Sequence, residues 1–582
     1  MIKNYLKIAF RNVRRNKVFS AINIAGLAIG MAVFILMAEY VVSEWSSNRF
    51  LSKFDQLYRI GSTAKAGNSY YLQPGFAPAI KERFPSVEAT VRVADGIGAG
   101  VISSNTQGKE PVSFREENIF YVEGNFLDVF DFPFLSGNKS LYAPRTAVIS
   151  EKIARKVFGK TDAAGQTINI SNQFGNTAYT VSGVVKDIPA SSDIRAELFL
   201  SIHTLENAAN RDGNDWADPN TTESGFTNVY TLLRKGTDVP ALSQQVAAYI
   251  HSVNKTTNGS EYFFQPFRHL HLAPSFDYPY QTFGSLQLVT LLLGVALLIL
   301  FIAWINYINL STVQSLRRVK ESGVRKVLGA SRLQLALQFL SETLILTIIS
   351  IVISILLVNI FQPVFNRFTG IELSLSVLNN GWIIAGGILL VVGGALLSGG
   401  YVAFVLSAFK PTSAFKSKPE KLNRGISLRK GLVVFQFSIS IVFIIATIVL
   451  YNQLEYMKTQ KLGISLDQLL VIKGPTVSND GQADRNYAFK TELLRLPFVK
   501  KASASNNIPG IGYNFSTENI TRQVPEAGDE KKSYKMFICD QNFFDTYSIG
   551  FSQGKTFTEE EANGGWNNSQ KLILNEKAAE QL

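Results

Sequence analysis

Two Gly-Lys-Thr triplets are the most obvious candidates for chemistry in this sequence. Residues 159–161 and 554–556 both match the end of a phosphate-binding loop. Such a loop also needs a glycine five positions before the triplet, because its backbone amides must turn around the phosphates. Ala154 and Ile549 occupy those two positions. We therefore interpret both triplets as loop residues, and we expect the chain to have no nucleotide site of its own.

Two histidines two positions apart, His269 and His271, are a second candidate. On a strand they would share one face and could bind a metal. Zinc needs three or four protein ligands, and the neighbouring sequence offers no third. A strand that returns to the membrane is the preferred interpretation. Neither GxSxG nor HExxH occurs, and the single Cys539 excludes an intramolecular disulfide. We expect neither a bound metal nor an enzyme.

The positive charge is concentrated in three short segments. Residues 1–17 hold six Lys and Arg and no acid, residues 311–332 hold six against Glu321, and residues 407–430 hold seven against Glu420. The rest of the chain is slightly acidic, so the net charge of +12 does not describe a basic face that could bind nucleic acid. Basic residues that flank apolar runs instead indicate the cytoplasmic side of a membrane.

Five apolar runs are long enough to cross a bilayer. The first is too long for the apolar region of a signal peptide, and the basic residues before it place the N-terminus in the cytoplasm. Residues 2–15 have the pattern of a basic amphipathic helix that lies in contact with membrane lipids. The predicted spans are Phe19–Val42, Leu286–Ile308, Leu344–Phe361, Trp382–Leu406 and Leu432–Leu450.

Small and ionisable residues mark positions inside the spans. The Gly26-xxx-Gly30 motif and the glycine pairs at 386/387, 393/394 and 399/400 predict faces that pack closely against other helices. Glu39 and Glu342 lie near the ends of spans, where we expect both to be solvated. Ionisable residues in such places are candidates for function, and Glu342 is the stronger of the two.

The long polar segment after the first span mixes two periodicities. Tyr179–Val185 alternates like a strand, and Ser150–Phe158 has a helical period. The predicted fold is therefore a polytopic α-helical membrane protein with α+β extracytoplasmic domains.

The last part of the chain repeats the first. Residues 120–137 (FYVEGNFLDVFDFPFLSG) match residues 537–554 (FICDQNFFDTYSIGFSQG) at an offset of 417. Pro85-Ser86-Val87 likewise corresponds to Pro497-Phe498-Val499. The pattern predicts a tandem repeat of elbow helix, span, external domain and three spans. The second copy stops inside its external domain, so we expect the sequence to be a fragment.

The basic link between the second and third spans resembles a known family. Residues 318–332 (RVKESGVRKVLGASR), followed by Gln338-Phe339-Leu340-x-Glu342, resemble the signature of the FtsX-like permease domain of MacB-type ABC transporters. Residues 5–17 (YLKIAFRNVRRNK), residues 184–189 (VVKDIP) and the segment around Gln265-Pro266 and His271-Leu272 resemble the periplasmic core domain of that family. The resemblance covers nearly the whole chain.

The resemblance implies a permease that does not bind ATP itself. A separate ATPase dimer would seat on the cytoplasmic elbow and drive movement of the periplasmic domains, and Gly329 would provide a sharp turn. The chain lacks the fused ATPase of MacB and carries two permease units, as duplicated permeases of Bacteroidetes-type bacteria do. A periplasmic adaptor or outer-membrane partner is also implied. The predicted coupling residues are Arg318, Glu321, Gly323, Arg325, Lys326, Gly329, Ala330, Ser331, Arg332 and Glu342.

Two alternative functions stay open at this point. The chain could be a transmembrane scaffold that regulates a periplasmic cell-wall hydrolase, or a sensor that passes an external signal to a kinase. Each predicts a multi-pass protein of the bacterial inner membrane. The predicted parts are an interfacial helix and first span (1–43), a periplasmic core domain (44–282), a permease domain with its elbow at 311–342 (283–408), a second elbow helix and span (409–451) and a second, incomplete periplasmic domain (452–582).

Overall fold

The structure is a computed structural model of the chain. It describes residues 10–64, 67–104, 112–189, 191–257, 260–272, 284–317, 324, 328–329, 331–407, 423–460, 463–475, 481–510, 515–518, 520–526, 529, 532–563 and 571–582. The chain divides into a unit of long apolar helices and a unit that holds the polar regions. Each is described by itself.

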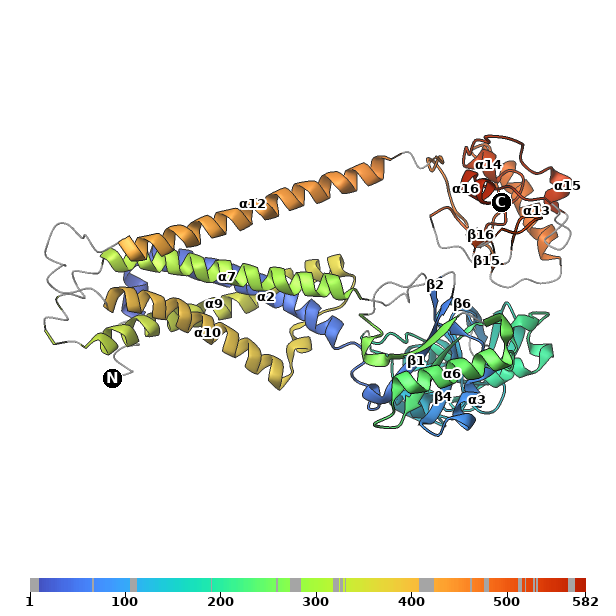
Figure 1. Cartoon of the computed structure of the whole chain (residues 1–582), viewed down its shortest axis with the longest axis horizontal. Helices are drawn as coiled ribbons and strands as arrows, with labels where there is room; N and C mark the ends of the chain where they lie inside the picture. Colours follow the sequence, from blue (N-terminus) through green and yellow to red (C-terminus); the bar gives the residue numbers. More distant parts are fainter. Residues whose placement is uncertain are drawn as a thin grey trace. The chain divides into compact units, whose positions relative to one another are not determined.

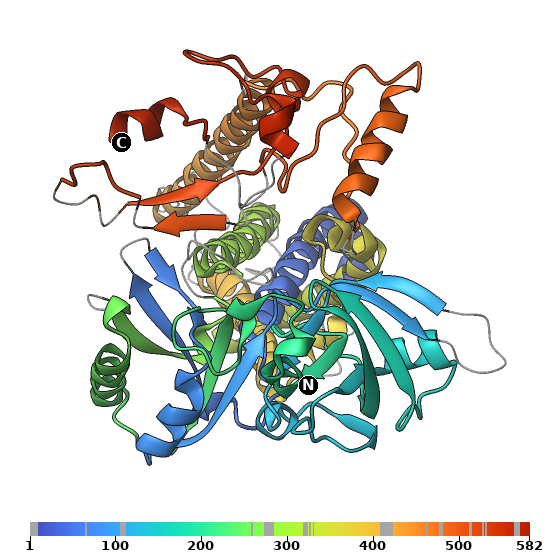
Figure 2. The same cartoon turned by 90° about the vertical axis from the view of Figure 1, so that its right-hand side faces the viewer.

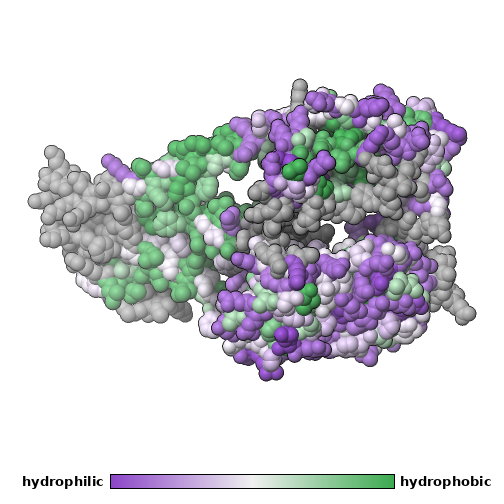
Figure 3. Space-filling view, turned by 45° about the vertical axis from the view of Figure 1, so that its right-hand side comes forward, coloured by the Kyte–Doolittle hydropathy of each residue, from purple (hydrophilic) through white to green (hydrophobic). Residues whose placement is uncertain are grey.

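Five long helices make up the described part of the helical unit (Figure 1). All five are long and apolar enough to cross a membrane, as the sequence predicts. In Figure 3 the apolar surface follows these helices. Their bounds are α2 (Lys17–Trp45), α7 (Leu286–Arg317), α9 (Arg332–Thr369), α10 (Gly381–Ser407) and α12 (Asn423–Thr459).

Four of these helices, α2, α7, α9 and α10, pack into a bundle. Its centre is a cluster of buried side chains that α2, α7 and α9 contribute, among them Leu27, Met31, Leu300, Ala303 and Leu346. α9 continues to Thr369, beyond the span predicted to end at Phe361, and Pro363 lies inside it. A proline removes one backbone hydrogen bond but does not end a long helix that neighbours hold in place.

The first polar region folds around one mixed sheet (Figure 2). Its strand order is β14-β1-β13-β4-β7-β12-β9-β11-β10-β5-β6, with β2, β3 and β8 attached at the sides. β11 pairs with β9 and β12 with β7 in parallel, whereas the other pairs are antiparallel. Helices between such strands define an α+β domain, which confirms the predicted fold class.

Three hydrophobic clusters hold this domain together. Helices α3 and α6 cover one part of the sheet, α4 lies in the central cluster, and α5 packs in the third. The bounds of the helices are α3 (Phe76–Arg83), α4 (Phe126–Phe130), α5 (Glu151–Phe158) and α6 (Val239–Val253). The bounds of the strands are β1 (Leu57–Ala64), β2 (Gly67–Ser69), β3 (Tyr71–Leu72), β4 (Val87–Ala94), β5 (Gly100–Ser104), β6 (Val112–Glu116), β7 (Ile119–Val122), β8 (Phe134–Gly137), β9 (Thr146–Ser150), β10 (Thr167–Asn172), β11 (Gly175–Val185), β12 (Leu198–Ser201), β13 (Thr227–Leu233) and β14 (Glu261–Pro266).

The predicted local elements of this domain are confirmed. Tyr179–Val185 lies in β11, and Ser150 is the N-cap of α5, where its hydroxyl accepts a hydrogen bond from the Ile153 amide. Gly159 ends α5 with a φ of +70°, so this Gly-Lys-Thr triplet begins at a helix C-cap. Both triplets lie outside helices and strands, as predicted.

The second polar region contains short elements in its described residues. A two-stranded antiparallel sheet pairs β15 (Phe515–Glu518) with β16 (Ser533–Met536). The helices are α13 (Gln482–Leu494), α14 (Phe543–Thr546), α15 (Glu559–Asn563) and α16 (Glu576–Gln581).

Candidate functional site

The predicted coupling elbow lies between the end of α7 and the start of α9. Of its residues, the structure describes the backbone of Gly329, Ser331, Arg332 and Glu342. The predictions for Arg318, Glu321, Gly323, Arg325, Lys326 and Ala330 lie outside the described residues.

The described end of the elbow is a sharp turn followed by a strongly capped helix. Gly329 is exposed and has a φ of +97°, a conformation that favours glycine. The Ser331 hydroxyl accepts a hydrogen bond from the Gln334 amide at 3.2 Å, and the Gln334 side chain accepts one from the Ser331 amide at 2.9 Å. This reciprocal capping box fixes where α9 begins. The direction of the chain at the elbow is therefore set locally.

Glu342 lies deeper in the bundle than the sequence suggests. Its exposed fraction is 9%, so the expectation that it would be solvated is wrong. The neighbouring Thr343 accepts a hydrogen bond from the Tyr307 hydroxyl of α7 at 2.8 Å, and both side chains are buried. The part of α9 that follows the elbow thus carries polar groups into the bundle, where they meet partners on α7.

Glu39 is also buried, at the other end of the bundle. It is fully covered by neighbouring side chains, so the expectation that it would be solvated is wrong as well. The Gln362 amide donates to Glu39 Oε2 at 2.9 Å and to Asn366 at 3.1 Å, and Asn366 donates to the Leu373 carbonyl at 3.0 Å. This chain of hydrogen bonds joins α2 to the C-terminal turns of α9 and gives the buried Glu39 Oε2 a partner.

His271 pairs with a carboxylate. Its Nε2 lies 3.2 Å from Glu44 Oε2 near the C-terminal end of α2, and both side chains are buried. The Gly284 amide donates to the His271 carbonyl at 2.8 Å. His269 lies in a short 3₁₀ helix, Phe267–His269, rather than in the predicted strand. This contact is a hydrogen bond between two buried side chains, and the described residues contain no group of three that could hold a metal ion.

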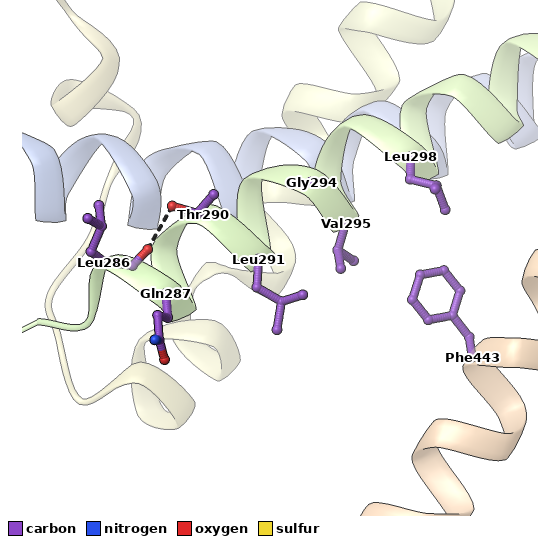
Figure 4. A pocket seen from close by; sticks show the side chains of 8 residues that line it. All are labelled: Leu286, Gln287, Thr290, Leu291, Gly294, Val295, Leu298 and Phe443. Carbon is purple, nitrogen blue, oxygen red and sulfur yellow. Dashed lines mark hydrogen bonds between the residues drawn. The ribbon is translucent and has the colours of Figure 1, made fainter. Parts of the chain in front are cut away.

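An apolar groove runs along α7 at the end near Leu286 (Figure 4). Its volume is about 710 Å³. It is lined by Leu286, Gln287, Thr290, Leu291, Gly294, Val295 and Leu298 of α7 and by Phe443 of α12. The Thr290 hydroxyl donates to the Leu286 carbonyl of its own helix. The groove therefore presents hydrocarbon, which suits lipid chains rather than a charged ligand.

An ion-pair cluster around the buried Arg92 stands out in the first polar region. Arg92 of β4 donates to Glu123 at 2.5 Å and to the Pro219 carbonyl at 2.8 Å. His203 Nε2 lies 3.2 Å from the other Glu123 oxygen, and its Nδ1 lies 2.8 Å from Glu206. Burial disfavours the Glu123 charge, but the contacts with His203 and Arg92 outweigh it and hold the pKa of Glu123 at about 2. The contact with Glu123 raises the pKa of His203.

The second polar region repeats the backbone contacts of this cluster. The Glu123 amide donates to the Arg92 carbonyl at 2.9 Å, and the Asp540 amide donates to the Ala504 carbonyl at 3.0 Å. The β4–β7 pair Val93–Val122 has its counterpart in the bridge Ser505–Cys539.

Side-chain contacts also recur between the two copies. The offset is 412 for residues near β4 and 417 for residues from β7 onward. Asn125 donates to the Thr90 carbonyl at 3.3 Å, and Asn542 donates to the Ala502 carbonyl at 3.4 Å. These are the offsets at which the two sequences match, so the sequence repeat and the local geometry agree. The cation differs between the copies, because Lys490 pairs with Asp540 at 2.6 Å where Arg92 pairs with Glu123.

Sequence reasoning missed Arg92, Glu123, His203, Glu44 and Tyr307 as members of buried polar contacts. Nothing in the sequence brings these residues to their partners, which lie in distant elements. The available signals were weak. Tyr307 is a hydroxyl-bearing residue inside a span, and Glu123 recurs as Asp540 in the repeat.

The fold defines a multi-pass membrane protein with an α+β extramembrane domain after its first span. Two family models match: the MacB-like periplasmic core domain over residues 20–249 and the FtsX-like permease C-terminal domain over residues 293–411. The chain therefore carries these two domains in this order, which supports a permease of the MacB/FtsX type.

Individual relatives are distant. The chain is 25% identical over 222 residues to the uncharacterized ABC transporter permease YknZ of Bacillus subtilis, covering 38% of this chain and 48% of that protein. It is 24% identical over 393 residues to the macrolide export ATP-binding/permease protein MacB of Wolinella succinogenes, covering 62% and 54%. The chain thus spans about half the length of the curated relatives it matches. The crystal structure of the periplasmic region of MacB from Actinobacillus actinomycetemcomitans matches with 14% identity and a TM-score of 0.27, covering 38% of this chain and 91% of that one.

Proposed function

We propose that this chain is a permease subunit that couples ATP hydrolysis by a separate cytoplasmic ATPase dimer to movement of its extracytoplasmic domains. The chain itself is then not an enzyme, and ATP is bound by the partner. The inner membrane of a bacterium, with the N-terminus in the cytoplasm, is the location that this function requires. The same movement of the extracytoplasmic domains could drive export, lipoprotein release or control of a cell-wall hydrolase.

The observation that carries the proposal is the basic elbow and the way in which its described end is built. Six Lys and Arg accompany one acid in residues 311–332, between two spans. The glycine turn and the capping box then fix the start of α9 in a definite direction. A charged segment held in this way can bind a partner in one orientation, and movement of the partner can then be transmitted to α9. Relatives named as ATP-binding/permease proteins support the choice of an ATPase as that partner.

The test is co-purification of the chain with an ATPase encoded by an adjacent gene. The full chain and the ATPase are co-expressed, extracted in detergent and assayed for complex formation and for stimulated ATP hydrolysis. We expect the wild type to form a complex, and we expect Gly329→Val to lose the complex or its stimulation. Valine cannot adopt a φ of +97° without strain, so the elbow must change direction.

Gly370→Val is the matched control. Gly370 ends α9 with a φ of +69°, and a Cβ atom at either glycine would meet open space. Both variants therefore strain the backbone in the same way at opposite ends of one helix. If the two variants lose coupling equally, the elbow is not the seat of the ATPase. If the wild type binds no ATPase, the scaffold or sensor alternative replaces the proposal.

A further inference from the structure

One turn of α7, residues 303–307, contacts each of the other three helices of the bundle. The Ala303 Cβ lies 2.6 Å from where a Cβ on Gly30 of α2 would be placed, so the two helices approach closely there. The Trp304 ring occupies the place of a Cβ on Gly394 of α10. The Tyr307 hydroxyl donates to Thr343 of α9 at 2.8 Å.

The contact with α9 is part of a longer chain of hydrogen bonds. The Thr343 hydroxyl accepts this hydrogen bond and itself donates to the Phe339 carbonyl at 3.0 Å. Tyr307 is 4% exposed and Thr343 is 3% exposed, so water does not compete for these groups. The polar link is therefore buried and specific.

Helix α10 also packs against Thr343. A Cβ on Gly399 of α10 would lie 2.7 Å from the Thr343 hydroxyl oxygen and 3.2 Å from Leu340. A shift of α9 at this position therefore displaces α10 as well. Small residues permit such close approach in membranes, and here they bring three helices to one point.

The link also lies at matched distances from the elbow. Tyr307 precedes the end of α7 at Arg317 by ten residues, and Thr343 follows the start of α9 at Arg332 by eleven. At 1.5 Å per residue, each helix runs about 15 Å from this link to the elbow. The buried hydrogen bond thus joins α7 to α9 at nearly the same distance along each helix from the elbow.

We propose that residues 303–307 of α7 are the pivot of the bundle, and that Tyr307 is a positioning residue that carries movement of the elbow to α9 and α10. The inference rests on the proposed function, since it requires an elbow that a partner moves. Tyr307 acts through Thr343 and touches no nucleotide.

The experiment compares four versions of the full chain in complex with the ATPase. They are the wild type, Tyr307→Phe, Thr343→Val and the double variant, each assayed for the amount of ATPase that co-purifies and for stimulation of ATP hydrolysis. We expect each single variant to keep the complex but lose about fivefold or more of the stimulation, the lower end of typical coupling between sites. The double variant should lose no more than the singles, because both remove the same link.

Thr347→Val is the matched control. Thr347 is a buried threonine one turn away on the same helix, and its hydroxyl donates only to the Thr343 carbonyl within α9. It tests the loss of a buried hydroxyl without the loss of a contact between helices, so stimulation should stay near the wild-type value.

Two results would overturn the inference, and they are distinguishable. If the wild type couples and Tyr307→Phe couples as well as Thr347→Val does, the pivot is wrong and the proposed function stands. If the wild type does not stimulate the ATPase, the proposed function and the pivot fall together.

Discussion

The membrane bundle and the first extramembrane domain bury most of their polar side chains in different ways. In the bundle, hydroxyls donate mostly to carbonyls of their own helix, as Thr347 and Thr312 do, and close approach depends on glycines such as Gly30 and Gly394. In the domain, the buried Arg92 pairs with the half-buried Glu123, which also contacts the half-buried His203.

The difference follows from the surroundings of each region. Lipid is as apolar as a hydrophobic core, so apolar burial does not drive one membrane helix against another and close contact must do so. In the domain, burial drives folding, and charges can be tolerated inside it if each has a partner. Mutations that remove a charge partner should therefore be most damaging in the domain, and mutations that add volume should be most damaging in the bundle.

The largest effect is expected for Arg92→Met. It leaves the half-buried Glu123 carboxylate with His203 alone, and breaking a buried pair in this way costs at most about 3–5 kcal/mol. Hydrogen exchange of β4 and β7 in the full chain in detergent measures the loss. The control is Lys490→Met, which removes the cation of Asp540 in the second polar region. That cation is more exposed than Arg92 (18% against 3%), while the two carboxylates are alike (15% and 14%). Its effect is measured by hydrogen exchange around the bridge Ser505–Cys539. An equal effect of the two variants would show that burial of the cation does not set the cost.

The second largest effect is expected for the change in stability of the first extramembrane domain with pH. The pKa of Glu123, about 2, lies below its ordinary value of 4.5, so this group stabilises the fold above pH 4.5 and loses that effect as the pH falls towards 2. The size of the loss is on the order of 3 kcal/mol. The pKa of His203 is raised above 6.5, so its contribution is full below pH 6.5 and is lost as the pH rises through the folded value.

Thermal unfolding of the full chain from pH 2 to pH 8 measures how stability changes with pH in both ranges. Glu123→Gln removes the titrating carboxylate, so its stability should no longer change between pH 2 and 4.5, and above pH 6.5 it should keep only the pH dependence that Glu206 causes through His203. A variant whose transition moved in parallel with the wild type over the whole range would contradict the assignment.

A smaller effect is expected in the bundle for Gly394→Ala. The new methyl group would overlap the Trp304 ring, and overpacking of this kind costs about 1–3 kcal/mol. Gly393→Ala is the control, because a Cβ there meets open space. The two variants are compared by thermal unfolding in the same detergent. If both behave alike, α10 does not contact α7 through Gly394.

The smallest effect is expected at the start of α9. Ser331→Ala removes one hydroxyl from the capping box and should cost about 1 kcal/mol, the usual value of an N-cap. Ser150→Ala at α5 makes the comparable change in the extramembrane domain, where the Ser150 hydroxyl also donates to Glu197. Hydrogen exchange in the first turn of each helix reports both. We expect the α5 variant to lose more, because it breaks a second hydrogen bond as well.

The sequence by itself determined the features that depend on local pattern. The five spans, the strand at Tyr179–Val185, the helix capped by Ser150 and the turn at Gly329 all follow from periodicity, length or a special residue type over a few positions. The family also follows from local sequence, because its signature lies in one continuous segment at the elbow. The repeat belongs here too, since its offsets are visible without any structure.

Only the tertiary structure decided which distant side chains meet. Glu44 and His271 are 227 positions apart, and Glu39 and Gln362 are 323 apart, so no local pattern announces either pair. Whether Glu39 and Glu342 are solvated or buried depends on which helices surround them, which is also why that expectation was wrong. Tyr307 has a role only because α7 turns one face to three neighbours at once. Packing between helices is set by the fit of whole surfaces, and a single residue in the sequence does not show which surface it will meet.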